Sequence, residues 1–107
     1  MKSKRTKALD IDARTRQKVR ERDGCCVLCF LKYGRLNAAR LQCAHYIGRG
    51  QSGLGIPENL VMLCSDCHRE YDQTTERETD REIIADHLRH IYDGWDDMRL
   101  TYNKWED

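Results

Sequence analysis

The 107-residue sequence lacks a hydrophobic run of about 18 residues, which is the length that a membrane-spanning helix requires. Its first seven residues are basic and are not followed by the apolar segment of a secretory signal peptide. The sequence also lacks internal repeats and low-complexity segments. We therefore expect one small intracellular domain located in the cytoplasm.

Hydrophobic residues are scarce for a chain of this length. They make up 39% of the sequence, whereas charged residues make up 35%. The apolar core must therefore be thin, and a structural metal ion is the usual additional source of folding free energy at this size. Six cysteines are present. In a reducing cytoplasm, cysteines in paired motifs favour metal binding over disulfide bonds.

The net charge of +1 conceals a strong asymmetry along the chain. Residues 1–50 contain 13 Lys and Arg against 4 Asp and Glu, a net charge of +9, whereas residues 51–107 contain 6 against 14, a net charge of −8. The basic half favours binding to the phosphate backbone of nucleic acid. The alternative is that the two halves neutralise each other within the fold.

Capping residues predict the first elements of the chain. Residues 1–9 are expected to form a flexible basic arm. A helix follows, capped by Asp10 or Asp12 and running to about Arg22. Gly24 ends this helix, because glycine tolerates the left-handed conformation of a C-terminal cap.

Hydrophobic spacing predicts two strands and two further helices. The expected order is a loop over 30–39, a strand over 41–47, a glycine-rich loop over 48–55, a strand over 60–63, a helix from Ser65 and a helix over 79–93. Alternation places Leu41, Cys43 and His45 on one face of the first strand. The C-terminal tail carries Trp95, Tyr102 and Trp105, which are expected to pack on the domain.

Two Cys-x-x-Cys pairs, Cys26 with Cys29 and Cys64 with Cys67, are the strongest motif. Each turn can place two thiolates on one zinc ion, so the two pairs together predict a closed tetrahedral site. Cys25 competes with Cys26 as the first ligand, and the alternative to a metal site is a set of four buried free thiols. A redox dithiol is disfavoured, because no βαβ pattern surrounds either pair.

Two histidines accompany the cysteines. His45 projects from the first predicted strand, and an imidazole can act as a general base near neutral pH, although a lone histidine is more often structural. His68 and Asp72 stand four residues apart on a predicted helix, so they can share a divalent cation or simply form a surface hydrogen bond. Asn59 alone indicates a turn or a cap.

The ordered combination of Cys-x-x-Cys, Ala44-His45, Asn59 and Cys64-x-x-Cys67-His68 resembles the HNH endonucleases, especially small members from bacteriophages and prophages. The resemblance covers about residues 14–75. It implies an α+β fold, a small zinc-stapled ββα-metal domain with flanking N- and C-terminal helices. The basic arm would span 1–9, the core 10–75, and a C-terminal helix and tail packed on the core 76–107.

The resemblance also implies roles for individual residues. His45 matches the general base that activates water, Asn59 the central residue that orders the loop or reaches the metal, and His68 a ligand of a catalytic divalent cation. Asp72 matches the position of a second ligand in some members. Cys26, Cys29, Cys64 and Cys67 match the structural zinc ligands. Many members bind the cation through an Asp or His immediately before the general base, where this sequence has Ala44.

The activity that the resemblance implies is hydrolysis of DNA phosphodiester bonds, as an endonuclease or a nickase, with Mg²⁺, Mn²⁺ or Ni²⁺ as the catalytic ion, inside a bacterial host cell. Arg49 is a candidate phosphate clamp, because a guanidinium can hold two oxygen atoms, although it is equally well an ordinary solvated arginine. The recognition surface is expected to include the basic helix around Arg14, Arg16, Lys18, Arg20 and Arg22. A homodimer or a phage or host protein partner remains open. The alternative function is a non-catalytic zinc module that binds DNA or a protein partner.

Overall fold

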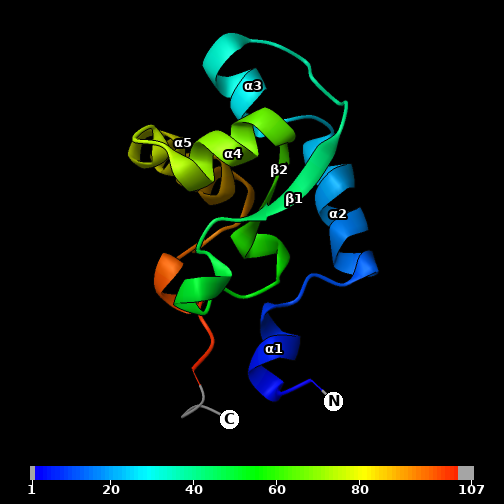
Figure 1. The fold of residues 1–107 in the computed structure, drawn as a ribbon, viewed down its shortest axis with the longest axis vertical. Helices are drawn as coiled ribbons and strands as arrows, with labels where there is room; N and C mark the ends of the chain where they lie inside the picture. The colour runs from blue at the N-terminus through cyan, green and yellow to red at the C-terminus, as the bar shows by residue number, and fades with distance from the viewer. Residues whose placement is uncertain (1, 104–107) are drawn as a thin grey trace.

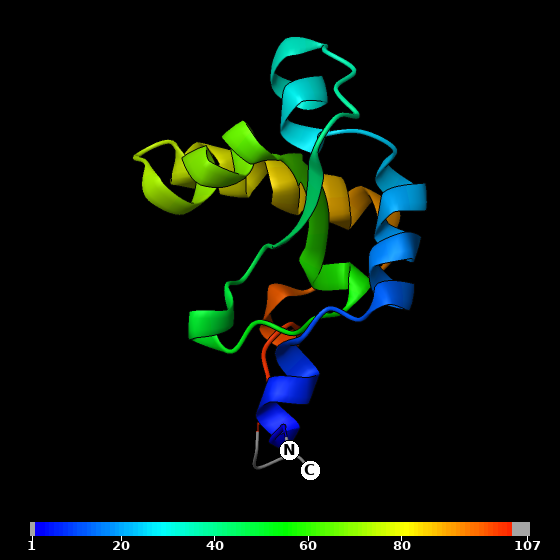
Figure 2. The same ribbon diagram turned by 45° about the vertical axis from the view of Figure 1, so that its right-hand side comes forward.

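Two short antiparallel strands lie at the centre of the fold, which is a computed structural model describing residues 2–103 (Figures 1 and 2). The fold belongs to the α+β class. Its elements are α1 (Lys4–Leu9), α2 (Ala13–Asp23), α3 (Val27–Tyr33), β1 (Leu41–His45), β2 (Leu60–Cys64), α4 (Ser65–Gln73) and α5 (Arg77–Ile91), with 3-10 turns η1 (Arg49–Gln51), η2 (Pro57–Asn59) and η3 (Asp97–Arg99). Both predicted strands are present. No helix among the described residues is long and apolar enough to cross a membrane.

Strand β2 is buried on both of its faces, which explains its uninterrupted run of hydrophobic residues. It pairs with β1 in a register that sets Leu41 opposite Cys64 and His45 opposite Leu60. Leu60 and Met62 pack with Val19 of α2, whereas alternate residues of the same strand pack into the larger core beneath α4 and α5. The sheet is therefore covered by α2 on one side and by α4 and α5 on the other (Figure 1).

Helix α2 begins and ends at two of the predicted caps. The Asp12 side chain accepts a hydrogen bond of 2.7 Å from the backbone N–H of Thr15, so Asp12 rather than Asp10 is the N-cap. Gly24 closes the helix in the left-handed conformation, with φ of 69°.

Two segments differ from the expectations. The predicted flexible arm contains helix α1, which Ser3 caps and whose Leu9 is only 1% exposed. The predicted loop over 30–39 is helical as far as Tyr33, and Gly34 then ends α3 with φ of 64°. In both cases a local cap and buried apolar contacts stabilise a helix that is too short to show a clear hydrophobic period.

The segment after α5 returns to the glycine-rich loop. Gly53 and Thr101 form an isolated antiparallel bridge, and the N–H of Leu54 donates to the carbonyl oxygen of Leu100 at 2.8 Å. Trp95 stacks edge-on against Tyr46, with ring centroids 5.5 Å apart. Of the other two aromatic residues expected to pack on the domain, Tyr102 donates its N–H to Ser52 and Trp105 lies outside the described residues.

Candidate metal centre and histidine cleft

Four cysteines converge between α3 and the junction of β2 with α4. The ligand atoms of Cys26, Cys29, Cys64 and Cys67 all lie within 4.8 Å of one another. In each pair the first cysteine is the N-cap of a helix and the second lies in the first turn of that helix. This arrangement brings both sulfur atoms of a pair to the same helix end, where the backbone dipoles favour thiolates.

The spacing of these sulfur atoms matches a tetrahedral metal site. Cys29 Sγ lies 3.8 Å from Cys64 Sγ and 3.7 Å from Cys67 Sγ. Four sulfur atoms at about 2.3 Å from a central zinc ion would lie about 3.8 Å apart, because this is the edge of a tetrahedron of that radius. The four cysteines could therefore hold a metal ion such as zinc. Cys25 is not part of the cluster and lines a separate pocket beside Val27.

Burial and hydrogen bonding shift the pKa values of the clustered thiols in different directions: despite its burial, hydrogen bonds within the cluster lower the pKa of Cys64, whereas burial raises the pKa of Cys67. Burial raises the pKa of Cys26 to about 11. A bound cation favours the thiolate, so metal binding at this cluster displaces protons and becomes weaker as the pH falls.

His45 ends β1, and its ring is fixed by the N-terminal segment. Its Nε2 atom lies 2.8 Å from the carbonyl oxygen of Leu9. A carbonyl oxygen can only accept a hydrogen bond, so Nε2 carries the proton and Nδ1 holds the free electron pair of the neutral ring. Burial lowers the pKa of His45, and the charges of Arg49 and His68 lower it further. The ring is therefore neutral at neutral pH and can accept a proton at Nδ1.

The cleft beside His45 has a volume of about 510 Å³ and is open to solvent. Its walls carry both signs of charge, from Lys2, Asp10, Asp12, Arg16 and Arg49, together with Ile11 and Cys43. Asp10 is bound by two cations, Lys2 at 2.6 Å and Arg49 at 2.7 Å. Arg49 is therefore partly neutralised in the free protein, although 47% of its side chain is exposed.

Asn59 is fully buried and holds the two ends of the glycine-rich loop together. Its Oδ1 accepts the N–H of Ile47 at 2.8 Å, and its Nδ2 donates to the carbonyl oxygens of Ile47 at 3.1 Å and Leu54 at 2.8 Å. Gly53 fits here only because it lacks a side chain, since a Cβ would lie 1.7 Å from the carbonyl oxygen of Ile47. Asn59 thus orders the loop, and both its side-chain oxygen and its side-chain nitrogen are used in these hydrogen bonds.

His68 and Asp72 form a pair on α4. Nε2 of His68 lies 3.3 Å from Oδ2 of Asp72, and Nδ1 lies 2.6 Å from Oε1 of Gln42 on β1. Both ring nitrogens face oxygen atoms, so a cation at His68 has to replace one of these contacts. Ala44 is buried in the core and offers no ligand. Within residues 2–103, the four cysteines are the only group of three or more potential metal ligands.

The contact between α1 and the His45 ring is barely visible in the sequence. The Leu9 carbonyl reaches His45 because α1 docks on the glycine-rich loop. The N–H of Gly55 donates to the carbonyl oxygen of Ala8 at 2.9 Å, and Arg5 donates to the carbonyl oxygen of Arg49 at 3.1 Å. The only sequence signal for this contact is the glycine at position 55, whose Cβ would lie 2.1 Å from the carbonyl oxygen of Asp10.

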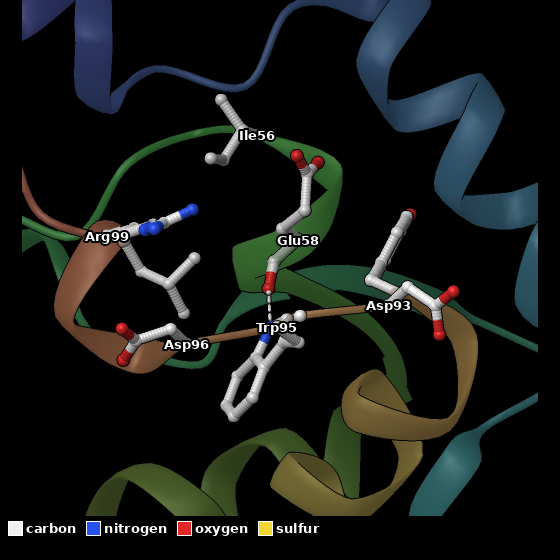
Figure 3. A pocket seen from close by; sticks show the side chains of 9 residues that line it. Ile56, Glu58, Asp93, Trp95, Asp96 and Arg99 are labelled. Atoms are coloured by element: carbon white, nitrogen blue, oxygen red, sulfur yellow. Dashed lines mark hydrogen bonds between the residues drawn. The ribbon is translucent and has the colours of Figure 1, made fainter.

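Another pocket lies between η2 and the segment after α5 (Figure 3). Trp95 donates from Nε1 to the carbonyl oxygen of Glu58 at 2.8 Å, which fastens this segment to η2 next to Asn59. Glu58, Asp96 and Arg99 line the same pocket. None of the predicted site residues lines this pocket.

The structure therefore brings the four cysteines together, places His45 in an open cleft, and pairs His68 with Asp72 on α4. His68 is close enough to His45 for its charge to lower the pKa of that ring. Among known proteins, no family model, curated protein or solved structure matches this chain. Any functional assignment depends on the residues of the site.

Proposed function

We propose that the protein is a metal-dependent DNA endonuclease or nickase of the HNH type, with a ββα-metal core around a structural zinc ion. The observation that carries the proposal is the orientation of His45. Its ring is held at Nε2 by the Leu9 carbonyl, and its cleft is flanked by Arg16 and Arg49. A neutral imidazole with Nδ1 free, next to cations that attract phosphate, has the chemistry of a general base for hydrolysis.

In this proposal Nδ1 of His45 takes a proton from a water molecule as the water oxygen attacks phosphorus. The new P–O bond forms while the P–O3′ bond breaks, and the electron pair of the broken bond leaves with O3′. The Leu9 carbonyl keeps its hydrogen bond to Nε2 throughout and stabilises the imidazolium that forms, because its oxygen carries a partial negative charge. Arg49 is placed to hold a non-bridging phosphate oxygen once DNA competes with Asp10 for its guanidinium.

His68 and Asp72 would hold the divalent cation, Mg²⁺, Mn²⁺ or Ni²⁺, together with water and DNA oxygens. When bound, the cation supplies stabilisation of the negative charge that develops on the phosphate and on the leaving oxygen. The zinc ion of the four cysteines would have a structural role, since it joins α3 to the end of β2 and to α4. The S···S distances of 3.7 and 3.8 Å support that assignment.

A non-catalytic zinc module that binds DNA or a protein partner is the second candidate. Two observations favour it: Ala44 stands where many HNH enzymes have a metal ligand, and His68 with Asp72 is a pair rather than a three-ligand group. The orientation of His45 favours the enzyme, because a binding module has no use for an imidazole held in one tautomer beside an open cleft lined by arginines.

Incubation of the purified protein with supercoiled plasmid, separately with Mg²⁺, Mn²⁺ and Ni²⁺, tests the proposal. An endonuclease or nickase converts the plasmid to relaxed or linear forms in at least one of these ions and does not do so without a divalent cation. Retardation of the plasmid on a gel without any conversion, in all three ions, would instead identify a binding module.

A further inference from the structure

Several exposed cations of the basic half, among them Arg16, Arg20 and Arg40, form no ion pair among the described residues. Among the described residues, no ion pair or side-chain hydrogen bond involves the guanidinium groups of Arg16, Arg20 or Arg40. Arg22 on the same helix is different, because it binds Asp23 at 2.8 Å and the carbonyl oxygens of Pro57 and Leu60. The structure thus removes Arg22 from the expected recognition surface and leaves its other members, Arg14, Arg16, Lys18 and Arg20, exposed. Of these, Arg16 and Arg20 line grooves beside β1, and Arg40 lines the second of these grooves.

These three arginines, here called the basic stripe, follow the course of β1. Arg16 shares the His45 cleft with Cys43, whereas Arg20 and Arg40 line a neighbouring groove of about 390 Å³ with Leu41. Arg16 and Arg20 are four residues apart, about 6 Å along α2 on the same side of the helix. The stripe therefore extends from the His45 cleft to the groove at the first residue of β1. Strand β1 itself runs beside α2 in both ribbon views (Figures 1 and 2).

The surroundings of the stripe keep it positively charged. The sequence has no Asp or Glu between Asp23 and Glu58, and Asp23 itself is buried against Arg22 and His87. At the His45 end, Asp10 is bound by Lys2 and Arg49, and Asp12 caps α2. Asp12 shares the His45 cleft with Arg16, and Glu21 follows Arg20 on α2 and accepts a hydrogen bond from Gln17, but neither carboxylate forms an ion pair with Arg16, Arg20 or Arg40 among the described residues.

The backbone of Arg40 adds a second observation. Arg40 has φ of 56°, a left-handed conformation that is unfavourable for a non-glycine residue. It stands in the turn immediately before β1, where glycine or asparagine fits the backbone better. The residue at this strained position is an arginine that lines the same groove as Arg20.

We infer that the basic stripe binds successive phosphates of duplex DNA on one side of the bond presented to His45. This inference rests on the proposed function for the position of the scissile bond. Strand β1 is about 13 Å long, since four steps of about 3.3 Å separate its five residues, and this length matches about four base-pair steps of 3.4 Å. Exposed guanidiniums beside a strand of this length can each contact a phosphate of a duplex.

The test measures DNA binding rather than cleavage. The His45→Ala protein is used without added divalent cation, so the DNA stays intact, and fluorescence anisotropy reports its affinity for a short labelled duplex as the salt concentration rises. The test variants are Arg16→Gln, Arg20→Gln and Arg40→Asn. The matched controls are Arg14→Gln and Lys18→Gln, which lie about 200° around α2 from Arg16 and Arg20 and line neither groove.

Each test variant is expected to reduce the slope of log affinity against log salt by about 1. Between about 50 and 200 mM salt, such a variant loses about threefold less affinity than its parent. The controls are expected to keep the parent slope. The proposed role of the stripe is refuted if the slopes of the test variants do not change, or if the controls change by the same amount. It is also refuted if the parent protein prefers single-stranded DNA or RNA to the duplex. A protein that binds duplex DNA through the stripe and never cleaves it would uphold the stripe and refute only the enzyme.

Discussion

The carbonyl oxygen of Leu9 lies 2.8 Å from Nε2 of His45, although 36 positions separate the two residues in the sequence. Leu9 ends α1, and α1 is anchored on the glycine-rich loop through Gly55. The N-terminal segment, which by composition is only a basic arm, therefore determines which nitrogen of His45 is free. This dependence can be tested without touching either residue.

Gly55→Ala is expected to reduce DNA cleavage by up to about 100-fold, because its Cβ would lie 2.1 Å from the carbonyl oxygen of Asp10 and must displace α1 from His45. Cleavage of plasmid under single-turnover conditions measures the effect. Gly50→Ala in the same loop is the matched control, since its Cβ would meet nothing within 4 Å. Equal activity in the two variants would mean that α1 does not position His45.

The pH dependence of cleavage follows from the lowered pKa of His45. Burial keeps this pKa below the ordinary value of 6.5, so the neutral base is fully present above that value and is lost only at lower pH. The acid limb of kcat/KM is expected to have its midpoint below 6.5. Arg49→Gln is expected to move this midpoint upward, because the Arg49 charge lowers the pKa of His45. A midpoint above 6.5, or a downward shift in the variant, would be incompatible with His45 as the base.

Cys64→Ser is expected to release the metal and to abolish cooperative thermal unfolding. A structural zinc site in a small domain contributes roughly 10 kcal/mol to folding, and the loss of one of four ligands removes much of it. Metal content by mass spectrometry and melting by circular dichroism report the two effects. Cys25→Ser is the control, because Cys25 is not among the four clustered cysteines and is expected to keep the metal and the melting temperature. If the two variants melt alike, the cluster has no structural role.

Asn59→Asp distinguishes a loop-ordering residue from a metal ligand. The carboxylate still accepts the hydrogen bond from the N–H of Ile47. It cannot donate to the carbonyl oxygens of Ile47 and Leu54, so two hydrogen bonds are lost, and each loss costs about 1–3 kcal/mol. We expect a lower melting temperature and lower activity at every cation concentration. A variant that needs less divalent cation than the wild type would show instead that this position reaches the metal.

The sequence predicts the two strands, helix α2 and the four clustered cysteines, because each of these features depends on residues that are close together in the chain. The continuous apolar run of β2, the Asp12 and Gly24 caps of α2, and the two-residue spacing between Cys26 and Cys29 all act within a few residues. Spacing alone also favoured Cys26 over Cys25 as a ligand, and the cluster agrees.

The surroundings of the histidines could not be predicted, because they depend on contacts between distant segments. The helical state of α1 depends on its cap at Ser3 and on its docking to the loop at Gly55. Arg22 looks like any other basic residue of α2, yet its guanidinium is tied to Asp23 and to two carbonyl oxygens of the 57–60 turn. Neither the docking of α1 nor the contacts of Arg22 can be inferred from amino-acid composition or hydrophobic periodicity.

Rates of plasmid nicking by the wild type, His45→Ala and His90→Ala, measured on proteins with equal bound zinc, test the central claim most directly. His90 is an exposed histidine on α5 that contacts only the carbonyl oxygen of Asp86 within the described chain. If His45 is the general base, His45→Ala loses nicking while His90→Ala retains the wild-type rate and all three proteins bind the same amount of zinc. Nicking by His45→Ala at the wild-type rate would contradict that role.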